Sequence, residues 1–202
     1  RRDTEVRYNL YSVIPSPVDD AVWGASEQFP GHIVRVDPGA NPPETCITEL
    51  YQVPDPGFDP RGIDIDSNGI VWAALAGSSH FARFDRSQCD VLNGPDTVDG
   101  THCEDGWTLF RTDGPTFSGS DVPSDFHYFG WVDQHNVIGF GEDTPIATGS
   151  NSDALLVLDP DSGEWTTLRV PYPMGFYHRG LDGRIDNIGD GWKGRALYAN
   201  YG

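Results

Sequence analysis

Three segments of the chain alternate apolar and polar residues, at 49–54, 107–112 and 165–171. Alternation of this kind is the period of a half-buried β-strand, because successive side chains point to opposite faces of a sheet. Shorter apolar stretches lie between these segments. No stretch of ten or more residues has the apolar spacing of an amphipathic helix. The pattern therefore predicts an all-β chain made of short strands.

One phrase recurs along the chain: a turn, a strand with a bulky apolar residue, a polar gap, and a second strand that ends in aspartate. The turn and apolar strand occur at 19–24, 67–73, 134–139 and 194–199, and the strand ending in aspartate at 32–37, 80–85 and 154–159. The copies differ in length. We expect insertions between Cys89 and Cys103 in the second copy and at 142–153 in the third. Such repetition is typical of propellers and solenoids.

A strand before each turn, as at 62–66 and 128–132, completes four strands per unit. Four-stranded sheets that repeat around a channel are the blades of a β-propeller. We predict one domain over residues 1–202 with units 8–56, 57–117, 118–173 and 174–202, which makes three blades and the start of a fourth. Propellers close with about four to eight blades, so we expect another part of the protein or another chain to complete the ring. A β-sandwich or a flat solenoid is the competing interpretation.

The charge of the chain is strongly one-sided. It has 31 Asp and Glu residues against 13 Lys and Arg, a formal net charge of -18. A surface this acidic repels phosphate backbones and anionic lipids, which argues against nucleic acids and membrane surfaces as partners. No apolar run approaches the roughly 18 residues of a membrane span. A cation, a cationic protein, or a neutral small molecule or glycan fits better, although acidity also serves solubility alone.

Two of the three cysteines, Cys89 and Cys103, enclose a polar insert with little apolar material to order it. The strands on either side read as hairpin neighbours, so we predict a Cys89–Cys103 disulfide, worth about 3 kcal/mol for a loop of ~15 residues. A disulfide indicates a secreted or periplasmic protein, with Cys46 left over. The alternatives are free thiols in a cytosolic protein, or a metal site of Cys89, His102 and Cys103, whose spacing matches no standard zinc motif.

Residues 60–72, Pro-Arg-Gly-Ile-Asp-Ile-Asp-Ser-Asn-Gly-Ile-Val-Trp, carry a more specific signal. With Phe-Ala-Arg-Phe-Asp at 81–85 and the turn at 157–165, they resemble the repeat of the virginiamycin B lyase (streptogramin lyase) family. The resemblance implies a propeller enzyme that opens a cyclic depsipeptide antibiotic by elimination, with His and Glu near Mg²⁺. The family's His-x-Glu arrangement is not found in a matching repeat position. We therefore carry over no catalytic residue, and the resemblance concerns the scaffold.

The repeat alignment places Arg61, His127 and Arg179 at equivalent positions before the first strands of their units, with His178 beside Arg179. In a propeller these positions converge on one mouth of the central channel. Arginine binds planar oxyanions, and histidine acts as an acid or base near neutral pH. We therefore predict a ligand-binding site of Arg61, His127, His178 and Arg179. The alternative is that each arginine pairs with an aspartate of a neighbouring blade and joins the blades.

No motif assigns a cofactor, although a divalent cation, Ca²⁺ or Mg²⁺, fits the acidic loops. Residues 64–69 resemble the first half of a calcium loop, but Leu75 stands where the closing glutamate belongs. A tight aspartate-stabilised turn explains them better. Glu142, Asp143 and Asp153 are acidic without a defined ligand spacing. The six tryptophans recur at strand positions, which we interpret as blade packing rather than as a carbohydrate platform.

Two classes of function follow. The first is a lyase-like or hydrolase-like enzyme with its site at the channel mouth, which requires that Arg61, His127 and Arg179 share a cavity. The second is a non-catalytic binding or assembly module. In that case strands near residues 8–14 or 197–201 pair with another polypeptide.

Overall fold

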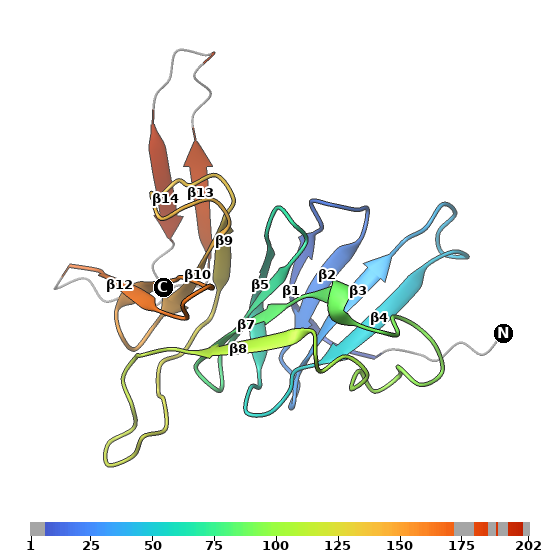
Figure 1. The fold of residues 1–202 in the computed structure, drawn as a ribbon, viewed down its shortest axis with the longest axis horizontal. Helices are drawn as coiled ribbons and strands as arrows, with labels where there is room; N and C mark the ends of the chain where they lie inside the picture. The colour runs from blue at the N-terminus through green and yellow to red at the C-terminus, as the bar shows by residue number, and fades with distance from the viewer. Residues whose placement is uncertain (1–6, 172–179, 186–188, 190–193, 200–202) are drawn as a thin grey trace.

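The chain folds into antiparallel sheets in which each strand is hydrogen-bonded to the next along the sequence (Figure 1). The structure is a computed structural model that describes residues 7–171, 180–185, 189 and 194–199. The first sheet consists of β1 (Leu10–Pro15), β2 (Val22–Ser26), β3 (His32–Asp37) and β4 (Ile47–Gln52). The second consists of β5 (Pro60–Ile65), β6 (Val71–Leu75), β7 (His80–Phe84) and β8 (Trp107–Arg111).

The third sheet repeats this arrangement, and a strand pair follows it. The third sheet consists of β9 (Gly130–Asp133), β10 (Thr144–Gly149), β11 (Ala154–Leu158) and β12 (Trp165–Arg169), and the pair of β13 (Leu181–Ile185) and β14 (Arg195–Ala199). A short 3-10 helix, Arg86–Gln88, follows β7. Sequential four-stranded meanders packed against one another are propeller blades. The predicted all-β, partial propeller is therefore confirmed.

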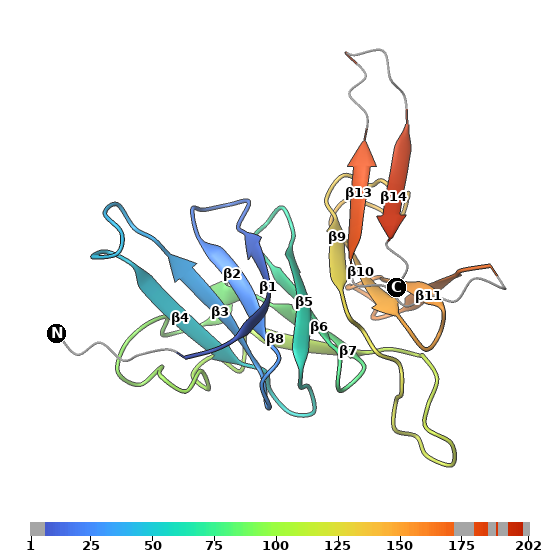
Figure 2. The ribbon, with the colours of Figure 1, turned by 180° about the vertical axis from the view of Figure 1, so that it is seen from behind.

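The first strand of each sheet contacts the first strand of the next: β1 lies against β5, β5 against β9, and β9 against β13 (Figure 2). Glycine permits the closest approach. A Cβ on Gly62 of β5 would lie 2.4 Å from the Cα of Phe129 and 2.7 Å from the N of Gly130. Backbone atoms cannot move aside as a flexible side chain can, so these first strands meet only because position 62 has no side chain.

Apolar clusters fill the spaces between the sheets. Trp23 of the first sheet packs with Leu75 and Phe84 of the second, and Trp72 of the second sheet packs with Val132 and Leu156 of the third. A smaller cluster joins the third sheet to Leu181 of β13. Trp23 and Trp72 are both buried, in agreement with the interpretation of the tryptophans as blade packing. Replacing either by alanine would cost about 3–5 kcal/mol, the usual range for large aromatic core residues.

The third sheet differs from the sequence prediction at its second strand. We expected a strand through Val137 and Ile138 and an insertion at 142–153, but the strand is β10, Thr144–Gly149, and residues 134–143 form the longer loop. The cause lies in Asp133, whose carboxylate accepts hydrogen bonds from the backbone N–H groups of Val137 and Ile138 at 2.7 and 2.9 Å. These two amides therefore form hydrogen bonds within a turn and not within a sheet, and Asn136 in this turn has a positive φ of 52°.

The predicted Cys89–Cys103 disulfide is present, with the two Cα atoms 5.1 Å apart. Cys46 is free and partly buried. The insert that the disulfide closes lies against the first sheet. The backbone N–H of Gln52 in β4 donates to Gly100 O at 2.8 Å, and Asn93 Nδ2 donates to Thr48 O at 2.9 Å. The insert therefore covers the outer edge of the first sheet as well as extending the second.

The aspartate turns expected at 64–69 and 159–163 are both formed. Asp66 Oδ1 accepts the N–H groups of Asn68 and Ile70, each at 2.9 Å, and Gly69 has a φ of 86°. Asp159 Oδ1 accepts the N–H of Asp161 at 3.0 Å. Both turns connect neighbouring strands. Nowhere in the described part of the chain is there a helix with the length and apolar character of a membrane span.

Candidate functional site

Arg61 lies near the start of β5, and its guanidinium sits between two carboxylates. Nε donates to Asp59 Oδ2 at 3.2 Å, and Nη1 lies 3.5 Å from Glu27 Oε2 in the loop between β2 and β3. Burial lowers the pKa of Arg61, but the two carboxylates raise it by more. The arginine therefore stays charged and joins the second sheet to the first. This is the arrangement in which an arginine joins neighbouring blades, except that its partner in the other blade is Glu27 and not an aspartate.

Three aromatic rings surround the same guanidinium. Its Cζ lies 5.1 Å from the ring centroid of Tyr11, 5.2 Å from that of Phe126 and 5.1 Å from that of Tyr128. Tyr11 belongs to β1, whereas Phe126 and Tyr128 precede β9. The rings thus come from the first and third blades. Each such cation–π contact contributes about 0.5–1 kcal/mol when partly exposed. Arg61 is the centre of a contact between three blades, which we call the Arg61 cluster.

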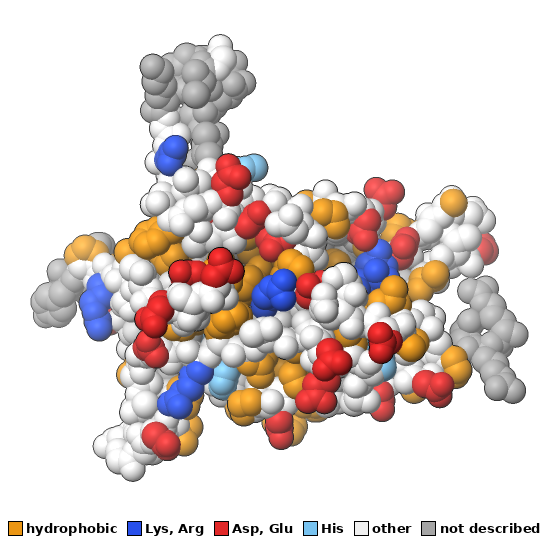
Figure 3. Space-filling model, in the orientation of Figure 1, with side chains coloured by type: hydrophobic (Ala, Val, Ile, Leu, Met, Phe, Trp, Pro, Cys, Tyr) orange, Lys and Arg blue, Asp and Glu red, His pale blue; other side chains and the backbone are white. Residues whose placement is uncertain are grey.

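The Arg61 cluster carries an excess of negative charge. Burial raises the pKa of Asp59, and the neighbouring charge of Glu27 adds to this, while Arg61 opposes it. Because one guanidinium faces two carboxylates, the cluster offers an approaching molecule carboxylate oxygens and ring faces rather than an unpaired cation. Nε and Nη1 of Arg61 face these two carboxylates, and the binding of an anion by Arg61 stays a prediction. Acidic side chains are also spread over much of the face shown in Figure 3.

His127 is fully buried and lies away from the Arg61 cluster, although its neighbours in sequence belong to it. Nδ1 is 2.8 Å from Thr148 O and Nε2 is 3.1 Å from Thr112 Oγ1. Since a carbonyl only accepts, Nδ1 carries the proton in this arrangement. Burial lowers the pKa of His127 by more than the charge of Asp125 raises it. The imidazole is therefore a neutral core group that connects the second sheet to β10.

The other two predicted site residues, His178 and Arg179, lie outside the described residues. The contacts of residues 126–128 show that the His127 side chain lies on the other side from those of its two neighbours. The rings of Phe126 and Tyr128 face Arg61, and the imidazole between them points into the protein. Sequence reasoning missed Tyr11, Phe126 and Tyr128. Phe126 and Tyr128 could have been found by aligning Asp66 with Asp133, because each aspartate caps the turn after the first strand of its unit. This alignment shifts the third unit by one residue relative to the second.

A second carboxylate joins the first strands deeper in the structure. Asp64 Oδ1 accepts the N–H of Ile65 at 2.8 Å, and Oδ2 accepts the N–H of Val132 on β9 at 2.7 Å. Burial raises the pKa of Asp64 to about 6, and the charges of Asp182 and Asp66 act in the same direction. Both of its oxygens are used by backbone donors. Asp64 therefore connects two blades and has little freedom to act as a general acid.

The residues that the structure describes contain no group of three or more His, Cys, Asp or Glu side chains placed to hold a metal ion. In the acidic loop before β10, Asp143 accepts hydrogen bonds from Ser67 N at 2.8 Å and Ser67 Oγ at 2.5 Å. It thereby ties the third blade to the turn after β5. Cys89 and Cys103 are bonded to each other, which removes the alternative of a metal site with His102.

Comparison with known proteins bears on the fold. No protein-family model matches the chain, and no curated protein matches its sequence. Among solved structures, selenomethionine-substituted virginiamycin B lyase from Staphylococcus aureus is 17% identical, over 80% of this chain and 55% of that chain, with a TM-score of 0.35. The catalytically inactive variant with Quinupristin is also 17% identical, over 81% and 56%, with a TM-score of 0.34.

Hydrazine synthase of Kuenenia stuttgartiensis is 11% identical, over 80% of this chain and 45% of that chain, with a TM-score of 0.41. The chain therefore spans about half the length of these solved proteins. Virginiamycin B lyase, whose family the repeats resemble, is thus among the solved structures found. Likeness at this level of identity concerns the fold alone, since one fold supports many activities.

Proposed function

We propose that the chain is the ligand-binding part of a secreted propeller, and that a glycan or a similar neutral, hydroxylated molecule binds at the Arg61 cluster. The observation that carries the proposal is the state of the Arg61 guanidinium. Two carboxylates and three ring faces already occupy it. Tyr11 is 40% exposed and the Glu27 side chain is 43% exposed, so the cluster still offers a ligand the ring surface and carboxylate oxygens that Arg61 leaves uncovered.

These groups suit a sugar. Its apolar faces stack on aromatic rings, and its hydroxyl groups donate hydrogen bonds to carboxylates. Further aromatic surface lies next to the two acidic residues in sequence: Phe29 is 82% exposed, and its ring meets the ring of Phe58 edge to face at 5.6 Å. Exposed aromatic surface beside placed polar groups is the usual composition of a binding site.

A binding role is favoured over a lyase-like or hydrolase-like role because His127, the candidate acid or base among the described site residues, is enclosed between Thr112 and Thr148. A general acid or base must come within hydrogen-bonding reach of the reacting group. Secretion is part of the proposal, and the Cys89–Cys103 disulfide supports it, because disulfides persist in oxidising compartments.

The proposal is tested by affinity electrophoresis and calorimetry with soluble cello-, xylo- and chito-oligosaccharides. Tyr11→Ala and Phe29→Ala should each weaken binding roughly two- to tenfold, the range expected for one lost stacking contact. Phe140→Ala is the control, because Phe140 is also exposed but lies in the loop between β9 and β10. Absence of binding to every oligosaccharide, or an equal loss in the control, would contradict the proposal.

A second candidate is an assembly module, and one observation favours it. On the first sheet, Val13 and Val22 point away from the face that carries Trp23 into the core, and Val13 is 62% exposed. In a propeller this face packs against a further blade. If another sheet covers it in solution, light scattering should show a complex, and Val13→Asp should dissociate it. A monomer at all concentrations would exclude self-assembly through this face.

A further inference from the structure

Two asparagine–glycine pairs occur in the chain, at 68–69 and at 93–94, and their hydrogen bonds differ. An asparagine that precedes glycine is prone to spontaneous deamidation, because glycine has no Cβ to keep its amide nitrogen away from the asparagine side chain. This nitrogen attacks the side-chain carbonyl carbon, so the reaction requires a nitrogen that is free and a side chain that can turn toward it. The contacts of the two pairs therefore decide which one reacts.

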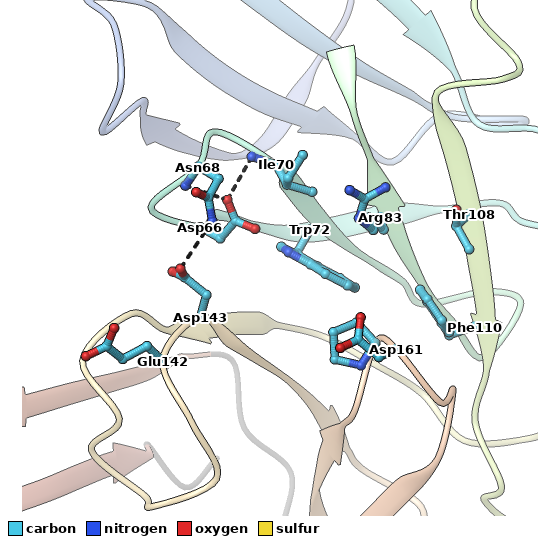
Figure 4. A pocket seen from close by; sticks show the side chains of 11 residues that line it. Asp66, Asn68, Ile70, Trp72, Arg83, Thr108, Phe110, Glu142, Asp143 and Asp161 are labelled. Carbon is cyan, nitrogen blue, oxygen red and sulfur yellow. Dashed lines mark hydrogen bonds between the residues drawn. The ribbon is translucent and has the colours of Figure 1, made fainter. Parts of the chain in front are cut away.

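The pair Asn68–Gly69 is held in the aspartate turn between β5 and β6. The backbone N–H of Gly69 donates to Asp66 O at 3.1 Å, and that of Asn68 donates to Asp66 Oδ1 at 2.9 Å. The side-chain Nδ2 of Asn68 lies 3.4 Å from Asp143 Oδ2, and Figure 4 shows Asp143 facing the turn. The nitrogen that would attack is thus already a hydrogen-bond donor in a fixed turn.

The pair Asn93–Gly94 lies in the insert closed by the disulfide, and within the described residues the N–H of Gly94 donates no hydrogen bond. Gly94 is held through its carbonyl instead, which accepts from Thr97 N at 3.3 Å and from Thr97 Oγ1 at 3.0 Å. A Cβ placed on Gly94 would meet no atom within 4 Å. The nitrogen that would attack is therefore free and uncrowded, and it follows an exposed asparagine.

The side chain of Asn93 is also one of the groups that hold the insert against the first sheet. Its Nδ2 donates to Thr48 O near one end of β4 at 2.9 Å, and Gly100 O accepts the N–H of Gln52 at the other end. Because Thr48 O is a carbonyl oxygen, only a donor can satisfy it. An exposed hydrogen bond of this kind opens by local motion, and each opening frees the side chain to turn toward Gly94.

We propose that Asn93–Gly94 is a site of spontaneous modification, at which the insert converts one of its own anchoring groups into a carboxylate. The amide nitrogen of Gly94 loses its proton and bonds to Cγ of Asn93. Nδ2 leaves as ammonia with a proton in exchange, and a cyclic succinimide remains. Water then adds to either carbonyl carbon of the ring and breaks its bond to nitrogen, which gives aspartate or isoaspartate. One water is consumed and one ammonia is released, with no oxidation or reduction.

The product cannot make the contact that Asn93 makes. A carboxylate accepts hydrogen bonds and has no donor, so it would repel Thr48 O. Its charge finds no partner within the insert, because the sequence between Cys89 and Cys103 contains three aspartates and no lysine or arginine. The modified insert should therefore separate from β4, while the disulfide still keeps its two ends together.

Incubation of the intact protein in mildly alkaline buffer, followed by reduction and trypsin digestion, measures both pairs in one sample. Trypsin places Asn68 in the peptide 62–83 and Asn93 in the peptide 87–111. Mass spectrometry follows deamidation, and electron-transfer fragmentation separates aspartate from isoaspartate. We expect Asn93 to convert at least about tenfold faster than Asn68, because the turn must open before Asn68 can react. Equal rates, faster conversion of Asn68, or no conversion of Asn93 while the free peptide 87–111 converts would each overturn the proposal.

The release of the insert is tested with Asn93→Asp, and Asn68→Asp is the matched control, because it makes the same change of charge at the other pair. Hydrogen exchange followed by NMR should show the N–H of Gln52 exchanging at least about threefold faster in Asn93→Asp than in the wild type, and at the wild-type rate in Asn68→Asp. Asn93→Gln keeps a donor and should retain the wild-type rate. Unchanged protection of Gln52 in Asn93→Asp, or an equal loss in both aspartate variants, would contradict the release.

Discussion

Glu49 of β4 pairs with Arg86 in the 3-10 helix after β7 and so joins the first sheet to the second. Removing this partner should destabilise the protein measurably. Arg86 donates to Glu49 twice, from Nε to Oε2 and from Nη2 to Oε1, each at 2.6 Å. Tyr51 donates from its hydroxyl at 2.7 Å, and Arg35 from Nη1 at 3.2 Å. Because Glu49 is buried, Arg86→Met leaves its charge with too few donors.

The size of the effect follows from burial. Removing one partner of a fully buried ion pair costs about 3–5 kcal/mol. Arg86 is 31% exposed, and Glu49 keeps two other donors, so we expect about 2 kcal/mol after allowing for solvent screening. For a domain of this size that corresponds to a fall in Tm of roughly 4–8 °C. Urea unfolding followed by tryptophan fluorescence measures it.

Arg83→Met is the matched control, since Arg83 is 33% exposed and, among the residues that the structure describes, forms an ion pair with Asp85 alone, at 3.4 Å. It should cost less than about 0.5 kcal/mol. In a double-mutant cycle, Arg86→Met should cost far less once Glu49→Gln has removed the charge. Equal destabilisation by Arg86→Met and Arg83→Met, or no coupling with Glu49→Gln, would refute the reasoning.

The same pair predicts a pH dependence of its own. Burial raises the pKa of Glu49, but hydrogen bonds from Arg86 and Tyr51 and the charges of both arginines bring it below the ordinary value of 4.5. A carboxyl with a lowered pKa contributes stability that is present above its unfolded value and is lost as pH falls through the folded one. The stability difference between the wild type and Arg86→Met should therefore shrink below about pH 4.5, and a constant difference from pH 7 to pH 3 would contradict it.

Three further outcomes are expected. Cys89→Ser with Cys103→Ser should lower the free energy of unfolding by about 2–4 kcal/mol, because the reduced chain regains the freedom of a loop of ~15 residues; unchanged urea midpoints would count against this. Burial lowers the pKa of His127, so its contribution is constant above about pH 6.5 and is lost as pH falls below it, and His127→Asn should flatten the urea midpoint between pH 7.5 and 5. Gly62→Ala would put a Cβ 2.4 Å from the Cα of Phe129 and should cost about 2 kcal/mol or more, read from thermal unfolding.

The sequence alone was sufficient to predict the four-stranded blades, because most strands carry a local pattern that recurs in each unit. Alternation identified β4, β8 and β12, and the aspartate turns identified the connections around β6 and β11. It failed at β10, whose residues Thr-Pro-Ile-Ala-Thr-Gly lack the β-branched and aromatic run of a typical strand. The apolar pair Val137 and Ile138 read as a better strand, yet the Asp133 carboxylate holds both amides in a turn. Local hydrogen bonds between a side chain and the backbone outweighed strand propensity there.

That error explains why the repeat alignment set His127 opposite Arg61, although their side chains lie apart in the structure. The register of the third unit was set on Ile138, and a slip of one residue in an extended segment exchanges the two faces. Asp66 and Asp133 each accept the N–H of the residue four positions on, and aligning these two aspartates makes Tyr128, not His127, the counterpart of Arg61. The structure agrees, because Tyr128 faces the guanidinium.

The first strand of the fourth unit can be aligned with that of the second unit directly. Arg-Gly-Leu-Asp at 179–182 matches Arg-Gly-Ile-Asp at 61–64 without a gap. Leu181 is buried as Ile63 is, and the charge of Asp182 reaches Asp64. Where two units share the residues of the first strand itself, the strands can be aligned whatever the length of the turn that follows. Where one unit lengthens its first turn, as at 134–143, the face is decided by the residue that caps the turn, and a repeat alignment must be anchored on that residue.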